Sequence, residues 1–201
     1  MTTRKDREVP EMRAMTAQLD GVRVAVLTAN EGVEQVELTE PVKALQGAGA
    51  DVRLVAPKAG KVQAFHHLDK GLAFPVDEPI DQVSPDDFDA LVLPGGVANP
   101  DQLRTVPEAV AFAAGFVEQG KPVASICHGP WTLVEAGVVE HRTLTSWPSL
   151  RTDIRNAGGR WIDDEVVVDE NGPGPIVTSR KPADLPRFCD EMLSAFSGAL
   201  V

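Results

Sequence analysis

Short apolar runs alternate with amphipathic segments along the chain. Four runs are apolar and rich in β-formers, as is typical of strands buried on both faces of a sheet: residues 22–29, 51–56, 88–93 and 122–126. Three longer segments have the spacing of helices: from about residue 36 to Gly47 or Gly49, residues 107–119 and residues 185–196. This alternation predicts right-handed β-α-β crossovers and a doubly wound, mostly parallel sheet sandwiched by helices.

The remaining segments are shorter and less regular. Residues 57–85 indicate an excursion with short edge strands, and residues 99–104 a loop or short helix. Residues 142–147, 161–162, 166–168 and 176–179 suit short strands, and residues 150–156 a helix. We expect one α/β domain over residues 21–201. Residues 1–20 are polar, lack the apolar core of a signal peptide and suggest a flexible N-terminal extension, some of whose residues could dock on the domain.

Composition narrows the classes of function. The chain has 201 residues and a net charge of -11, which disfavours nucleic-acid or anionic-membrane partners. Its two cysteines, Cys127 and Cys189, are too few for a disulfide framework and fit a reducing compartment. No run approaches the length of a transmembrane helix. We therefore expect a cytoplasmic protein.

The stretch KPVASICHGPW, residues 121–131, carries the most specific chemical signal. Its apolar strand stops at Cys127, and Pro130 stands where a helix can begin. Such a strand-turn-helix is the geometry of a nucleophile elbow, with small residues, Ser125 and Gly129, beside the bend. A lone cysteine after an apolar strand is often a core residue instead, but a titratable Cys-His pair in a tight turn favours a site. The helix N-terminus predicts a thiol pKa below about 8.5.

Three loops should meet at the carboxyl ends of the parallel strands, where ligands gather in open α/β sheets. They are the glutamate-rich loop of residues 30–38, the Pro94-Gly95-Gly96 turn and the cysteine elbow. The two glycines suit an oxyanion hole or, as the plainer alternative, a simple turn. The sequence lacks dinucleotide, P-loop and serine-hydrolase motifs, and its four histidines lack strong zinc spacing. We expect no cofactor and no metal.

Several ordered stretches resemble the ThiJ/PfpI superfamily, and within it the PfpI-type intracellular cysteine peptidase and deglycase branch. They are LTANEGVEQVEL, FDALVLPGG, NPDQLR, KPVASICHGP, LTSWPS and RKPADLP, and they span residues 22–196. The resemblance implies a flavodoxin-like sandwich, similar to class I glutamine amidotransferases. It also implies homodimers or higher homo-oligomers with active sites near an interface.

The resemblance also assigns roles at the elbow. Cys127 matches the family nucleophile, and His128 the histidine that follows it. Glu37 best matches the acid that hydrogen-bonds the cysteine sulfur, with Glu34 as the other candidate. A low-pKa thiolate would require Glu37 to hold a proton and donate it to sulfur, because an ionised carboxylate would repel the thiolate.

Other assignments stay open at this point. Asp101 matches an acid that reaches the histidine from a neighbouring subunit, although an Asp there also commonly starts a helix. The backbone N–H groups of Gly95, Gly96 and His128 are candidate oxyanion donors. Adjacent residues at a bend need not face each other, so His128 is either the base or an interface residue. Trp131 and Trp147 replace residues common in relatives and should line the pocket.

Two classes of function fit these residues. The first is a cysteine-dependent hydrolase or lyase acting in a stress response, by peptide hydrolysis, removal of early glycation adducts or glyoxalase-type conversion of methylglyoxal. Its substrate would be a small carbonyl compound or a peptide, attacked by the thiolate at carbon. The alternative is a non-enzymatic redox sensor or chaperone with an oxidisable Cys127.

Overall fold

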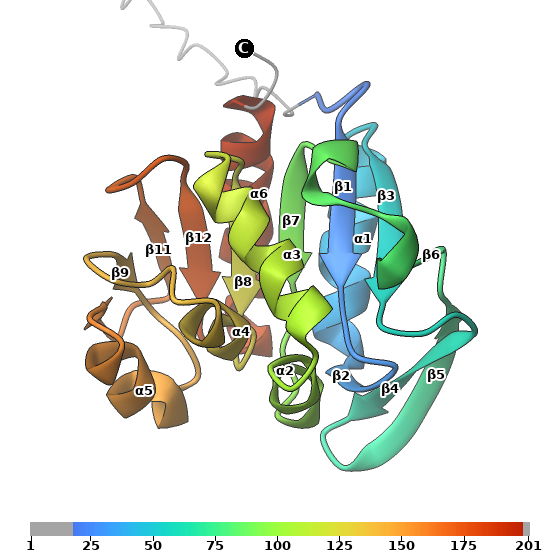
Figure 1. The fold of residues 1–201 in the computed structure, drawn as a ribbon, viewed down its shortest axis with the longest axis horizontal. Helices are drawn as coiled ribbons and strands as arrows, with labels where there is room; N and C mark the ends of the chain where they lie inside the picture. Colours follow the sequence, from blue (N-terminus) through green and yellow to red (C-terminus); the bar gives the residue numbers. More distant parts are fainter. Residues whose placement is uncertain (1–17, 199–201) are drawn as a thin grey trace, which may run out of the picture.

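A seven-stranded sheet forms the centre of the protein in the computed structural model, which describes residues 18–198 (Figure 1). The strand order is β11 (Val166–Asp169), β12 (Ile176–Ser179), β8 (Val123–Ile126), β7 (Ala90–Leu93), β1 (Arg23–Leu27), β3 (Asp51–Ala56) and β6 (Glu78–Pro79). Every neighbouring pair is parallel except β11 with β12. The predicted doubly wound, mostly parallel α/β sheet is therefore confirmed.

Helices cover both faces of this sheet (Figure 1). One face packs against α1 (Gln35–Gly47) and α6 (Leu185–Ser197), and the other against α3 (Pro107–Glu118), α4 (Pro130–Glu135) and α5 (Arg151–Asn156). Alternate residues of β1 divide between the two cores: Val24 and Val26 face the first, and Ala25 and Leu27 the second. Because both faces of the sheet are buried, the sequences of the central strands are continuously apolar.

A second, smaller sheet extends from the edge of the molecule near β6. It contains β2 (Glu31–Glu34), β4 (Lys61–His66) and β5 (Asp69–Pro75), with β4 between the other two. The predicted excursion thus contains an antiparallel hairpin of β4 and β5. The loop expected over residues 30–38 is wrong in its first part, because β2 pairs with β4 there. The helix expected from about residue 36 is confirmed, since α1 begins at Gln35 and ends at Gly47.

The shorter elements complete residues 18–198. They are α2 (Ala98–Leu103), the parallel pair β9 (Thr143–Leu144) and β10 (Arg160–Trp161), and four single turns of 3₁₀ helix at Ile80–Gln82, Pro85–Asp87, Pro148–Leu150 and Pro182–Asp184. No helix within residues 18–198 is both long and apolar enough to cross a membrane.

The ordered domain begins before the predicted boundary at residue 21. Leu19 is fully buried in the core, and its N–H donates to the Ala48 carbonyl over 2.7 Å. The last residues of the predicted extension therefore belong to the domain. Residues 1–17 of that extension lie outside the described residues.

Candidate active site

Cys127 occupies a sharp turn between β8 and α4. Its φ of +61° lies in the left-handed region, which non-glycine residues seldom adopt. The Cys127 N–H donates to the Ser179 carbonyl over 3.0 Å, and its carbonyl accepts from the Trp147 N–H over 2.8 Å. Gly129 is needed beyond the bend, since a Cβ there would lie 2.6 Å from Ser125 Oγ. The surrounding hydrogen bonds thus hold an unfavourable backbone conformation, as at many functional sites.

The His128 ring lies beside the cysteine sulfur. Its Nδ1 is 3.2 Å from Cys127 Sγ, and its Nε2 is 3.4 Å from Ser149 Oγ. Trp147 stacks on the ring with centroids 5.7 Å apart. Burial lowers the pKa of His128 to about 4, so the imidazole is neutral at physiological pH. A neutral ring can accept the thiol proton at Nδ1, so adjacency in the chain does not keep these two residues apart.

Glu37, in the first turn of α1, is fully buried against the elbow. Burial raises its pKa to about 8, and neighbouring Glu34 adds to the rise. The Cys127 side chain and the N–H groups of Gly95 and Gly96 face the carboxyl and offset part of this effect. No hydrogen bond of good geometry reaches either carboxyl oxygen from the described residues, so these polar contacts are long or oblique. At neutral pH Glu37 mostly holds a proton that it can donate to sulfur.

Cys127 as a residue is only 6% exposed. Burial raises the pKa of Cys127, and the charge of an ionised Glu37 raises it further. The N–H groups of Gly96 and His128 act in the opposite direction but are outweighed. The expectation of a thiol pKa below the free value is therefore wrong, because burial prevails over the helix N-terminus. Since two adjacent negative charges are unfavourable, the Cys127–Glu37 pair begins to lose its first proton near pH 8.

A cavity of about 200 Å³ opens onto the sulfur. Its lining is Glu34, Glu37, His67, Leu68, Gly96, Val97, Cys127, His128, Trp147 and Pro182. Trp147 is 39% exposed and forms one wall. Glu34 also lies there, and its Oε2 accepts from the His67 N–H over 3.0 Å. Lysine and arginine are absent from this lining, and residues 18–198 contain no cluster of three or more His, Cys, Asp and Glu side chains that could hold a metal.

Sequence reasoning missed part of this lining. His67 and Leu68 come from the tip of the β4–β5 hairpin, and Leu68 is 88% exposed. Nothing in a loop of two histidines shows that the hairpin folds back over the elbow. Pro182 follows β12, and only its place in the RKPADLP stretch singled it out.

Two expected site residues lie elsewhere in this chain. Trp131 is not part of the cavity lining: its Nε1 donates to Asp153 over 2.9 Å, and the Arg104 guanidinium lies 5.0 Å above its ring. Asp153 on α5 and Arg104 at the end of α2 therefore hold the Trp131 ring outside the cavity lining. Asp101 is exposed on α2, and its approach to His128 of a neighbouring subunit remains a prediction.

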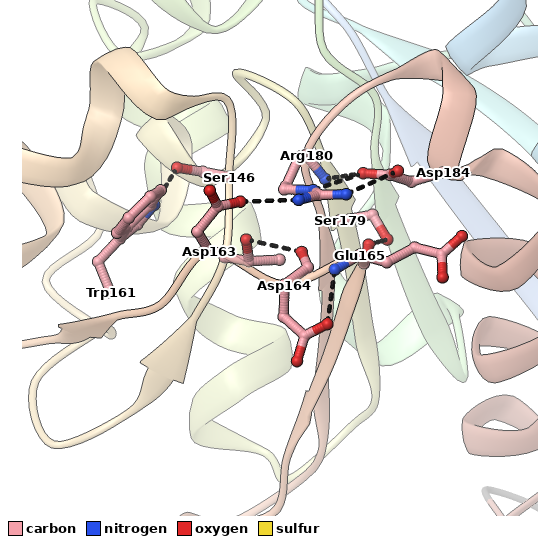
Figure 2. Close-up of polar contacts among 9 residues, drawn as sticks. Ser146, Trp161, Asp163, Asp164, Glu165, Ser179, Arg180 and Asp184 are labelled. Atoms are coloured by element: carbon pink, nitrogen blue, oxygen red, sulfur yellow. Dashed lines mark hydrogen bonds and ion pairs between the residues drawn. The ribbon is translucent and has the colours of Figure 1, made fainter.

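A polar network surrounds Arg180, which lies two residues before the cavity-lining Pro182 (Figure 2). The Arg180 guanidinium pairs with Asp184, 2.9 Å away, and with Asp163, 2.7 Å away. On the neighbouring segment, Trp161 Nε1 donates to Ser146 Oγ over 2.9 Å. Through Arg180 and Asp163, this network connects the segment after β12 to the loop before β11.

Comparison with known proteins identifies the family. The pattern of the DJ-1/PfpI family matches residues 22–195. The Deglycase PH1704 of Pyrococcus horikoshii is 46% identical over 164 residues, which cover 82% of this chain and 93% of the relative. YraA of Bacillus subtilis, named as a proposed cysteine protease, is 41% identical over 172 residues, which cover 86% of this chain and 96% of YraA. Among solved structures, a two-domain protein from Anabaena variabilis contains DJ-1/ThiJ/PfpI-like and ferritin-like domains. It is 33% identical to this chain with a TM-score of 0.78, and the match covers 86% of this chain and 47% of that protein.

Proposed function

Because the chain belongs to the DJ-1/PfpI family, we propose that it is a cysteine-dependent hydrolase that removes early carbonyl adducts from amines. One observation carries the proposal: Cys127 Sγ lies 3.2 Å from the neutral His128 ring and faces the buried Glu37 carboxyl at the wall of a cavity. A nucleophile with a proton acceptor on one side and a proton donor on the other can form and release a covalent intermediate.

The chemistry follows from these positions. An adduct of methylglyoxal with an amine releases the amine while Cys127 Sγ bonds to the aldehyde carbon, and His128 Nδ1 takes the thiol proton and returns it to the departing nitrogen. The resulting hemithioacetal isomerises to a lactoyl thioester with protonated Glu37 as the carrier. Glu37 gives its proton to the ketone oxygen and takes the proton from the first carbon; it then gives that proton to the second carbon and takes the proton of the first hydroxyl, so it ends protonated as it began. Water then hydrolyses the thioester to lactate and restores the thiol. The overall reaction consumes one water and needs no external oxidant or reductant.

The cavity supports a small substrate. A volume of about 200 Å³, lined by apolar side chains around the sulfur, accommodates a three-carbon carbonyl unit but not an extended peptide. The absence of lysine and arginine from the lining also leaves nothing there to bind the carboxylates of an anionic thiol adduct. Both features favour removal of adducts from amines over peptide hydrolysis and over glyoxalase-type conversion of an anionic thiol adduct.

The decisive experiment exposes the protein separately to a methylglyoxal-treated amine and to hydrogen peroxide. We expect catalytic release of lactate with no stable mass change on Cys127, and loss of release in Cys127→Ser but not in Cys189→Ser. Stoichiometric oxidation of Cys127 without turnover would instead support the redox-sensor alternative.

We also propose that the protein assembles into a homodimer or higher oligomer, with Asp101 of one chain near His128 of another. Asp101 is exposed on α2 and therefore accessible to a partner, whereas Ser149 already lies on the Nε2 side of His128 within the chain. Sedimentation analysis of the parent and a structure of the assembled protein test this. An oligomer in which Asp101 is remote from every His128 would rule out the composite site. We place this activity in the cytoplasm, as part of a response to carbonyl stress.

A further inference from the structure

Asn99 lies directly behind the turn that supplies backbone N–H groups to the site. It is fully buried in α2 and takes no part in lining the cavity. Its Nδ2 donates to the Pro94 carbonyl over 2.9 Å and to the Gly95 carbonyl over 3.1 Å. One side-chain amide therefore holds two consecutive carbonyls of the turn after β7.

The geometry of the peptide bond turns these contacts into an orientation for the site. In a trans peptide the C=O and the following N–H point in opposite directions. Holding the Pro94 carbonyl against Asn99 directs the Gly95 N–H the other way, and holding the Gly95 carbonyl does the same for the Gly96 N–H. On that opposite side lie the Glu37 carboxyl and the Cys127 sulfur, since a Cβ on Gly95 would meet both Glu37 Oε2 and Cys127 Cβ. Through long or oblique contacts, the Gly95 and Gly96 N–H groups lower the Glu37 pKa, and the Gly96 N–H lowers that of Cys127.

The orientation of the Asn99 amide is itself determined. Its Oδ1 accepts from the Ala29 N–H over 2.7 Å, at the end of β1. An oxygen must face that donor and an NH₂ must face the two carbonyls, so only one orientation satisfies all three bonds. The Gly95 carbonyl also accepts a hydrogen bond from the Glu34 N–H over 3.4 Å. Gly95 has no room for a side chain, since a Cβ there would lie 2.6 Å from Cys127 Cβ.

We infer that Asn99 is a positioning residue: through the Pro94 and Gly95 carbonyls, it directs the Gly95 and Gly96 N–H groups onto the Cys127–Glu37 pair. These N–H groups stabilise the negative charge that the pair acquires when its first proton leaves. The inference rests on the proposed role of Cys127 as nucleophile, but it concerns the reactivity of the thiol, which can be measured without turnover.

Two variants separate hydrogen bonding from packing. Asn99→Leu keeps roughly the side-chain volume and removes the amide, whereas Asn99→Ala removes both. Asn30→Ala is the matched control, because Asn30 also follows β1 but bonds the Lys58 backbone instead of the glycine turn. The readout is the rate of iodoacetamide labelling of Cys127 from pH 6 to 10, with Cys189 in the same molecule as internal reference.

We expect both Asn99 variants to label Cys127 about tenfold more slowly at pH 7.5, with the midpoint of the pH profile moved up by about one unit, as loss of hydrogen bonds to a charged group predicts. Asn30→Ala should retain the parental profile. A folded Asn99→Leu protein with the parental profile would overturn the inference, because packing alone would then suffice. A slower profile together with absent lactate release in the parent would uphold Asn99 and refute the proposed function.

A measurement on the parent protein keeps the inference testable if both variants unfold. The amide signals of Gly95 and Gly96 should shift together between pH 6 and 10 in NMR spectra, and Cys127→Ser should alter that titration. The Asn99 side-chain amide protons should exchange slowly with solvent. Glycine amide signals that do not respond to pH would overturn the inference.

Discussion

The two thiols of this protein make an instructive pair. Cys189, in α6, is half-buried. Burial is the main reason that the pKa of its thiol rises to about 11, and the charges of Glu40 and Asp190 add to the rise. Cys127 is more deeply buried, and its pKa is also raised. What differs is the surroundings: Cys127 has a neutral imidazole 3.2 Å away and a carboxyl that holds a proton, whereas Cys189 has carboxylates near it. We therefore expect the reactivity of Cys127 to depend on the proton acceptors and donors placed beside it rather than on exposure or a low thiol pKa.

The largest expected effect separates the two cysteines by activity. Cys127→Ser should lower kcat for lactate release by about 10⁴-fold or more, because a hydroxyl is a far weaker nucleophile at neutral pH. Cys189→Ser should stay within about twofold of the parent. Steady-state kinetics on both variants, with thermal melts to verify folding, test this. Comparable losses in the two variants would remove the basis for treating the cysteines differently.

The next effect concerns the imidazole that Cys189 lacks. His128→Gln should lower kcat by about 10²-fold, the scale of a lost general base, with little change in KM. His66→Gln is the matched control, since His66 is exposed at the end of β4 and outside the cavity lining. An His128→Gln enzyme with parental kcat would leave Glu37 as the sole acceptor.

Glu37 should make stability depend on pH. Its pKa in the folded protein is about 8, against an ordinary value of 4.5, so the folded state binds a proton that the unfolded state has lost. This stabilisation is complete below about pH 4.5 and is lost as pH rises to about 8. Between pH 7 and 8, where His128 is mostly neutral in both states, the free energy of unfolding should fall by about 1 kcal/mol.

Urea unfolding at several pH values measures this slope. Glu37→Gln cannot titrate, so its stability should be nearly independent of Glu37-linked pH effects in the same window. Parallel curves for the parent and the variant would show that Glu37 is ionised in the folded protein, and the donor role proposed for it would fail.

The smallest effect is the ratio of alkylation rates. Cys127 should react with iodoacetamide roughly tenfold faster than Cys189 at pH 7.5, because acceptors beside the sulfur remove its proton as the new bond forms; this is worth about one hydrogen bond to a charged group. The ratio should increase as the Cys127–Glu37 pair loses its first proton near pH 8. Peptide mass spectrometry quantifies both sites, and faster labelling of the more exposed Cys189 would contradict the comparison.

Much of the fold was predictable because its signals are local. The strand over residues 51–56 was predicted with its observed bounds, and the closing helix has Phe188, Met192 and Phe196 on one buried face, as the spacing requires. The elbow was also readable, because a strand, a bend and a helix follow one another within a few residues. The short β2 was missed, since it forms by pairing with β4, about thirty residues away.

The amino-acid sequence by itself determined which loops meet at the carboxyl ends of the strands, and hence that Cys127, Glu37 and the Gly95-Gly96 turn share one edge of the sheet. Only the tertiary structure decided how these groups face one another. Asn99 spans two loops through bonds to Ala29, Pro94 and Gly95, and Trp131 turns from the pocket toward Asp153. Burial from both sides, not position in the chain, raises the Glu37 pKa. Such features depend on contacts between segments far apart in the chain, and hydrophobic periodicity carries no information about them.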